Sequence, residues 1–207
     1  MMRPHPLSAP DVMQPHKTTA DARPGRFAPY RLIHKALRLM LQEGLTACGR
    51  LDARDARQRI ALADDIEQRL CICELHITAQ NRFFHGPLQA RGARVVQGIQ
   101  NDHWDQLACI DELRTCLHAL RDTPQDPPAE AHDLYLQLSQ FVADTLAHMA
   151  EEETFLTQAL WSHFSDHEIM GFSRAADSAW PPEVQESLQR WLSRSLAAPE
   201  LDSLQAG

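Results

Sequence analysis

The chain has 207 residues, enough for one domain with a substantial core and additional tails. Its formal charge of -8 at pH 7 is spread without a basic block, which argues against nucleic acid and anionic membranes as partners. The N-terminal segment lacks the apolar region of a secretory signal, and no stretch is apolar for long enough to cross a bilayer. We therefore expect a cytoplasmic protein.

The composition favours an all-α fold, because glycine is scarce, with 8 residues, whereas leucine, alanine, glutamine, arginine and the acidic residues are abundant. The 5 cysteines are an odd number in a chain without an export signal, so we expect reduced thiols on small buried or half-buried side chains. These residues are Cys48, Cys71, Cys73, Cys109 and Cys116.

Residues 1–29 are rich in proline among polar residues, and we interpret them as a flexible tail in which His5 and His16 are solvated. A first helix is expected from Tyr30, where apolar residues recur at helical spacing until Gly49. Asp52 or Asp55 could cap a second, longer helix, whose apolar stripe runs from Ile60 to Phe84 and which we expect to end at Gly86-Pro87.

A third helix is expected over residues 95–120, before the helix-breaking segment TPQDPP, and a fourth over residues 129–164. The fourth has an apolar side comprising Leu134, Leu138, Phe141, Thr145, Phe155 and Leu156. Pro181 and Pro182 open a shorter amphipathic helix, EVQESLQRWLSRSL. The pattern predicts an antiparallel up-and-down four-helix bundle over residues 30–165, followed by a C-terminal extension, residues 166–207, with one additional helix.

Each of the four long helices carries a histidine on the stripe that should face the core. Taken singly, each is more often a satisfied core histidine than a metal ligand. Four of them on four helices are better explained by a shared metal ion, because imidazole is costly to bury unless its nitrogens have partners. These residues are His34, His76, His103 and His148.

Glu152 strengthens this interpretation, because it lies four residues after His148 and so shares a helical face with it. A solvated run of glutamates, residues 151–153, is the alternative explanation. Glu151, three residues after His148, is a second candidate ligand if the register differs.

Four segments together resemble the hemerythrin-like, or HHE cation-binding, family: RLIHKALRLML, CELHITAQNRFFHGPL, NDHWDQLACIDEL and FVADTLAHMAEEETFLTQALW. The resemblance implies a four-helix bundle in which histidines hold a pair of irons, bridged by carboxylates from the second and fourth helices. It further implies that His34, His76, His103 and His148 are the imidazole ligands and that Glu152 is one bridging carboxylate. The other bridge is expected at position 80, where this chain has Gln80.

Gln80 departs from the family pattern in a way that affects the metal site, because a neutral amide cannot bridge two cations as a carboxylate does. The site could then be di-iron with one protein bridge and extra solvent, mononuclear, selective for another metal such as zinc, or without metal. His85 resembles a His-Pro element of the family interrupted by Gly86, and we expect it to cap or pack near a helix end. The remaining histidines are expected at helix ends or on outer faces: His118, His132, His163 and His167.

These features favour a protein that senses or handles oxygen, nitric oxide, peroxide or iron, with a metal ion and a small diatomic or peroxide as its ligands. Two alternatives stay open: an enzyme that reduces peroxide or activates oxygen, and a metal-free helical scaffold that binds a protein partner. Dedicated enzymatic activity is the less favoured of the two main roles. The sequence leaves the oligomeric state open.

Overall fold

The computed structural model describes residues 25–122 and 126–205, and this part of the chain folds into helices without a β-strand. The expected all-α class is therefore confirmed. Within the same residues, no helix combines the length and the apolar character that are needed to cross a lipid bilayer. Most of the predicted tail, including His5 and His16, lies outside the described residues.

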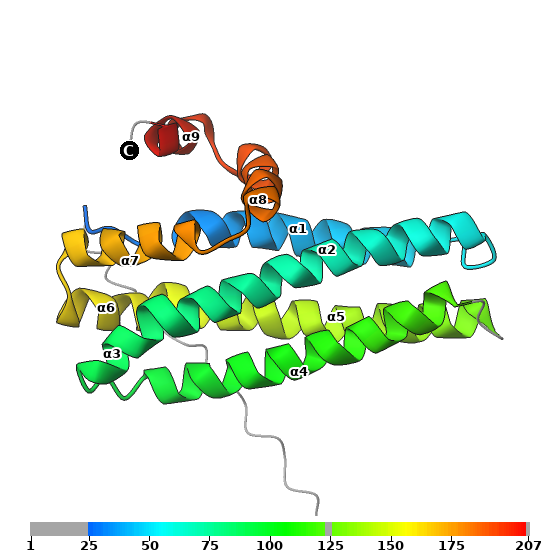
Figure 1. Cartoon of the computed structure of the whole chain (residues 1–207), viewed down its shortest axis with the longest axis horizontal. Helices are drawn as coiled ribbons and strands as arrows, with labels where there is room; N and C mark the ends of the chain where they lie inside the picture. The colour runs from blue at the N-terminus through cyan, green and yellow to red at the C-terminus, as the bar shows by residue number, and fades with distance from the viewer. Residues whose placement is uncertain (1–24, 123–125, 206–207) are drawn as a thin grey trace, which may run out of the picture.

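Four long helices lie side by side along the longest axis of the molecule (Figure 1). Contacts join α1 to α2, α2 to α4, α4 to α5 and α5 to α1, so that all four helices border one interior. These helices are α1 (Arg31–Gly49), α2 (Ala56–Gln80), α4 (Val96–Arg121) and α5 (Pro127–Glu151). Their fully buried apolar side chains include Met40, Leu70, Ile110, Leu113, Leu138 and Phe141.

The beginnings of α2 and α5 are set by aspartates that cap the exposed N–H groups of the first turn. Asp55, one of the two predicted caps, accepts hydrogen bonds from the backbone N–H groups of Arg57 and Gln58 at the start of α2. Asp126 precedes the two prolines that open α5, and its side chain accepts from the N–H of Ala129. Local sequence thus determines where both helices start.

The predicted end of the second helix at Gly86-Pro87 is wrong. α2 continues into a π-helical turn, η1 (Asn81–His85), and then into α3 (Gly86–Ala90), where the proline stands in the first turn and needs no hydrogen-bond donor. The predicted fourth helix is interrupted in the same way, by η2 (Glu152–Leu156) between α5 and α6 (Thr157–His163). Both π turns therefore fall next to predicted site residues, at Gln80 and Glu152.

Two residues of the predicted apolar stripes face solvent, which corrects the sequence-based assignment. Phe155 is 57% exposed, because the wide turn of η2 directs Glu152 and Leu156 inward instead. Ile60 is 49% exposed, because its neighbour Arg59 takes the inward position and donates hydrogen bonds to the carbonyl oxygens of Leu120 and Ala53. In both cases the local register determines which side chain is buried.

The C-terminal extension contains three helices where the sequence predicted one: α7 (Asp166–Ser178), α8 (Pro182–Ser195) and α9 (Ala198–Gln205). The predicted helix corresponds to α8, which packs against α1 (Figure 1). Ser165 and Glu168 form a capping box at the start of α7. Just before α1, Arg26 bonds to Asp166 and Phe27 accepts a hydrogen bond from Trp161, so the last residues of the predicted tail are fixed in place.

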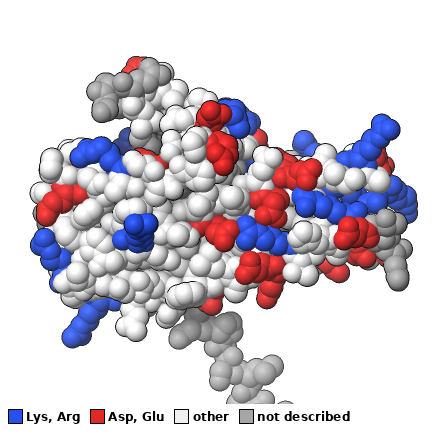
Figure 2. Space-filling model, viewed as in Figure 1, with Lys and Arg blue, Asp and Glu red and all other residues white. Residues whose placement is uncertain are grey.

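Acidic and basic side chains are intermingled over the visible face of the molecule (Figure 2). Several of them join neighbouring helices: Arg114 on α4, for example, bonds to Glu67 and Glu74 on α2 at 2.9 and 2.7 Å. Hydrogen bonds from these two carboxylates raise the pKa of the arginine, Glu74 contributing most. Such partly exposed pairs each contribute little to stability, but they help to fix which helices are neighbours.

Each of the five cysteines is a free thiol, as predicted. Cys48 and Cys73 are buried, and burial raises the pKa of the first to about 11 and that of the second to about 12. Both thiols are therefore protonated at neutral pH, which makes them poor metal ligands.

Candidate metal centre

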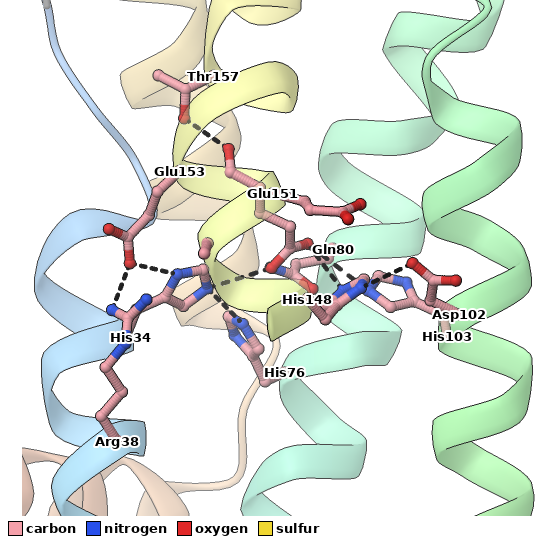
Figure 3. A network of polar contacts seen from close by, with 12 residues as sticks. His34, Arg38, His76, Gln80, Asp102, His103, His148, Glu151, Glu153 and Thr157 are labelled. Carbon is pink, nitrogen blue, oxygen red and sulfur yellow. Dashed lines mark hydrogen bonds and ion pairs between the residues drawn. The ribbon is translucent and has the colours of Figure 1, made fainter. Parts of the chain in front are cut away.

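The structure brings the four predicted histidines together in the interior between the long helices (Figure 3). They are no more than 8% exposed, and they converge on the carboxylate of Glu152, which is fully buried. The Nε2 atom of His34 lies 3.2 Å from Glu152 Oε2, while those of His103 and His148 lie 3.6 and 3.5 Å from Oε1. His76 Nε2 lies 3.3 Å from His34 Nε2.

Glu152 holds the centre of this cluster, as its position one turn after His148 predicted. Burial raises the pKa of its carboxyl group, but the imidazoles of His103, His148 and His34 outweigh that effect and hold the pKa well below its usual value. The carboxylate is therefore ionised, and it is available as an anionic ligand. Glu151, the alternative ligand, is exposed and lies outside the cluster.

Two sets of side chains in the described part of the chain have the geometry of a metal site, and both include Glu152. The first is His34, His76 and Glu152, and the second is His85, His103 and Glu152. In each set, one potential ligand atom per residue lies within 4.8 Å of the others. A carboxylate with two oxygens, shared by two sets of imidazoles, is the arrangement that a pair of cations requires.

His85 belongs to the centre, contrary to the expectation that it would only cap or pack near a helix end. It is fully buried, and its ring stacks on that of His103 with centroids 4.9 Å apart and planes inclined by 9°. Burial lowers its pKa to about 3, and the charge of His103 adds to that effect. The imidazole is therefore neutral, the form that binds a metal ion.

Helical periodicity could not have placed His85 in the centre. It follows His76 by nine residues, which in an uninterrupted α-helix corresponds to about 900°, half a turn away from the same face. The π turn η1 changes this rotation and brings His85 to the interior. The available sequence signal was the short segment HGP, without a helical period to support it.

Three of the imidazoles are fixed from behind by side chains that the sequence analysis did not identify. Each contact joins the Nδ1 atom to a side-chain oxygen, which leaves Nε2 directed toward Glu152 (Figure 3). Such outer contacts determine the tautomer and the orientation of metal-binding histidines. The pairs are His34 with Glu153 at 3.0 Å, His103 with Asn81 at 2.8 Å and His148 with Asp102 at 3.3 Å.

The two histidines of the first set have opposite pKa shifts. Burial lowers the pKa of His34, but hydrogen bonds with Glu152 and Glu153 outweigh it and raise the pKa overall. Burial, followed by the charge of His34, lowers the pKa of His76 to about 3. The protonated His34 can therefore donate to the neutral His76 across their 3.3 Å contact when no metal is bound.

Gln80 lies at the centre, as predicted, and is 2% exposed. Its Nε2 atom donates a hydrogen bond of 3.0 Å to Glu152 Oε2, a contact that a carboxylate at this position could not make with an ionised partner. Its Oε1 atom has no hydrogen-bond partner among the described residues. The amide therefore both holds the bridging carboxylate and keeps an oxygen that can act as a neutral ligand.

The donor set fits a bound cation, because several buried polar atoms of the cluster have no hydrogen-bond partner in the part of the chain that the structure describes. Leaving such an atom unpaired costs about 1–3 kcal/mol, and a shared cation would pair all of them. The atoms are His85 Nδ1 and Nε2, His103 Nε2, His148 Nε2, Gln80 Oε1 and Glu152 Oε1. The 3.5–3.6 Å separations between the last two histidines and Glu152 are too long for hydrogen bonds.

The surroundings of the centre agree with the remaining expectations. Tyr30 packs against His34, with ring centroids 5.4 Å apart and planes inclined by 15°. The histidines expected outside the site lie there: His118, His132 and His167 are exposed and His163 is half-buried. Comparison with models of known protein families, with curated proteins and with solved structures gave no match, so the function must be inferred from the chain's own side chains.

Proposed function

We propose that the chain is a hemerythrin-like metal-binding protein that holds non-haem iron in an antiparallel four-helix bundle over residues 30–165. The observation that carries this proposal is the set of unpartnered, buried imidazole nitrogens that converge on the buried carboxylate of Glu152. A purely structural cluster would be expected to satisfy these atoms with hydrogen bonds, because leaving them unpaired costs stability.

The ligands divide between two positions that share Glu152. His34 and His76 face Oε2 from one side, and His103 and His148 face Oε1 from the other. His85 joins the second group through its stacking on His103. The arrangement supports two ions bridged by one protein carboxylate, with Gln80 contributing no charge to the bridge.

Iron bound at these residues would supply a redox-active Lewis acid that binds a small molecule such as oxygen, nitric oxide or peroxide. The chain itself contributes burial, which excludes bulk water, and the oriented imidazoles behind which Glu153, Asn81 and Asp102 lie. Gln80 leaves the centre with one negative charge fewer than a second carboxylate would give. We therefore favour sensing or handling of these molecules over transport.

The second candidate function is a metal-free helical scaffold, and the hydrogen bond from Gln80 to Glu152 favours it. That bond satisfies one oxygen of a buried carboxylate without any cation. The raised pKa values of His34 and His148 also allow positive charge beside Glu152 when no metal is present. In this case the protein would act through partner binding.

Metal analysis of the anaerobically prepared protein, loaded with ferrous iron and then desalted, distinguishes the two functions. We expect one or two ions per chain in the native protein and none in Glu152→Gln, because that change removes the shared anionic ligand. Glu151→Gln, at the exposed neighbouring position, is the matched control and should bind as the native chain does.

Gln80→Glu tests the role of the amide in the same assay. A second carboxylate should raise the iron content or its affinity, since it restores the missing negative charge beside the cations. Native protein that binds neither iron nor zinc, with a melting temperature unchanged by either ion, would contradict the proposed function and support the scaffold. Turnover of added peroxide by the loaded protein would instead assign an enzymatic role to the same centre.

A further inference from the structure

A cavity of about 270 Å³ lies beside the candidate metal centre, between the start of α1, the α2–η1 junction and the helices α7 and α8. His76 and Gln80 form part of its wall, so two residues of the centre also border the cavity. The C-terminal extension supplies the opposite wall through residues such as Ala176, Trp180 and Leu188. Anything bound here would lie next to the cluster around Glu152.

The wall of the cavity is mainly apolar. Its lining contains no lysine or arginine among the described residues, and Asp177, which is exposed to solvent, supplies its carboxylate. His76 is neutral, because burial and the charge of His34 lower its pKa to about 3. Such surroundings disfavour a negatively charged ligand and favour an uncharged one. The large apolar residues are Phe27, Tyr30, Phe84, Trp180, Leu188 and Leu192.

Four lining residues carry buried polar atoms that lack a hydrogen-bond partner in residues 25–122 and 126–205. Trp180, 5% exposed, has an unpaired indole N–H, whereas the indole N–H of Trp161 donates to the carbonyl of Phe27 at 2.8 Å. An indole N–H can only donate, so its missing partner is an acceptor. The four atoms are Trp180 Nε1, Tyr30 Oη, Ser173 Oγ and Gln80 Oε1.

The volume limits the size of the ligand. At about 30 Å³ for each water molecule, the cavity has room for on the order of nine waters, and so for a compact molecule the size of a substituted benzene. Pockets of this kind, apolar with a few convergent polar atoms, are typical of sites for small organic molecules.

We propose that this cavity binds a compact, uncharged, mainly apolar organic molecule with a hydrogen-bond acceptor, which the indole N–H of Trp180 holds beside the metal centre. The Gln80 side chain would then lie between the two sites, with its Nε2 on Glu152 and its residue in the cavity wall. The position of the ligand beside a metal ion rests on the proposed function. Its binding in the cavity does not, and can be tested without metal.

The test uses the ¹⁵N-labelled full chain in chelator, with acetophenone as the probe and the tryptophan indole N–H signals as the readout. Acetophenone should move the Trp180 signal, which Trp180→Phe identifies, and leave that of Trp104, 72% exposed, in place. Benzoate, of similar size but anionic, should bind at least about tenfold more weakly, because burying its charge in this cavity is unfavourable. Ethylbenzene, which lacks an acceptor, should bind about threefold to tenfold more weakly than acetophenone.

Ala176→Leu fills the cavity from α7 and should abolish the shift, whereas Ala61→Leu on the exposed face of α2 should preserve it. Leu188→Trp fills the same space from α8, and serves if the first variant does not fold. A Trp180 signal that acetophenone leaves unmoved up to its solubility limit, or that still moves in a folded cavity-filling variant, would overturn the proposal. Binding of acetophenone by a chain that takes up no metal would confirm the cavity and remove the metal centre beside it.

Discussion

Glu152 is a carboxylate buried completely between four helices, where an isolated charge would be strongly destabilising. The imidazoles on both sides compensate for this burial, and they depress its pKa far enough to keep it ionised. This residue therefore couples the two halves of the centre: a change at Glu152 affects both sets of histidines, whereas a change at one histidine should affect one set.

His85→Phe tests this division of the centre. Phenylalanine keeps the aromatic ring that stacks on His103 but removes both unpartnered nitrogens, so the metal-free variant should be more stable than the native chain by about 1–3 kcal/mol. The same variant should bind one iron fewer per chain, while the set around His34 and His76 is retained. Urea unfolding of the metal-free proteins and metal analysis of the loaded ones measure the two effects.

His118→Phe, an exposed change of the same kind, is the control for His85→Phe and should alter neither quantity. Native iron content in His85→Phe would show that this imidazole is not a ligand. A loss of stability without metal would show that its nitrogens have partners that the native fold depends on.

Part of the site could be predicted from the sequence because it follows the helical period. His148 and Glu152 lie one turn apart on one helix, and His34, His76 and His103 lie on apolar stripes whose inward face is clear. The outer partners were not predicted, since Asp102, Asn81 and Glu153 are ordinary polar residues whose contacts depend on neighbouring helices. His85 was misplaced because a π turn breaks the period on which the prediction depended.

At the scale of the helices, Gly44 on α1 permits a close approach to α2. A Cβ atom at this position would lie 2.9 Å from Arg69 Cδ and 3.2 Å from Ile66 Cδ1. Arg69 cannot easily move away, because its guanidinium is bonded to Asp65 and to the carbonyl oxygen of Met40. Glycine therefore serves the packing of two helices although it weakens one of them.

Gly44→Ala should accordingly destabilise the protein by about 1–3 kcal/mol, because overpacking outweighs the gain in helix propensity. Gly171→Ala in α7 is the matched control: nothing lies within 4 Å of its added Cβ, so it should stabilise the protein by up to about 1 kcal/mol. Urea unfolding of both metal-free variants measures the difference. Equal effects of the same sign would show that α1 and α2 can separate enough to admit a methyl group.

α9 is held against α1 by Glu200, whose carboxylate bonds to Lys35 at 2.6 and 2.8 Å and to Arg31 at 3.0 Å. The hydrogen bond from Lys35 is the largest cause that lowers the pKa of Glu200 to about 2, followed by the backbone N–H of Ala197. A depressed pKa means that this contribution is fully present above the ordinary pKa of 4.5 and is lost as the pH falls toward 2.

We therefore expect amide hydrogen exchange in α9 to accelerate as the pH is lowered from 6 toward 3, beyond the intrinsic change, while the long helices stay protected. Glu200→Gln should show the faster exchange already at pH 6, because the amide cannot replace the ion pairs. Glu186→Gln, an exposed change on α8, should not. Exchange in α9 that follows only the intrinsic pH dependence would argue against this attachment.

The missed elements have different physical causes. α7 carries a recognisable capping box, Ser165 to Glu168, but only two of its residues are buried, so it lacks a long apolar stripe. α9 is a short helix that the contacts of Glu200 attach to the long helices. Long helices with continuous stripes could thus be predicted, whereas elements that depend on tertiary contacts could not.

At the scale of the whole molecule, the candidate ligands come from α1, α2, η1, α4, α5 and η2, and so from every helix that borders the interior. A metal ion bound here would bind the folded chain alone, because unfolding separates these residues. Metal binding and the stability of the entire bundle are therefore linked.

Removal of iron by a chelator should lower the melting temperature of the native chain. At a free metal concentration about a hundredfold above the dissociation constant, the linkage amounts to about 2.7 kcal/mol. Calorimetry with and without metal gives the shift, and Glu152→Gln should melt at one temperature in both conditions. A native chain that melts identically with iron, with zinc and with chelator would place the cluster outside any metal-dependent stabilisation.

The π turns have a consequence for insertions and deletions in this chain. Each widens the helix locally, and η1 separates His76 and Gln80 from His85. Deleting a single residue from η1 would restore an ordinary α-helical path and rotate everything after it by about 100°. His85 would then leave the interior while His34, His76 and Glu152 stay together, so one codon would separate a two-ion centre from a one-ion centre in the same fold.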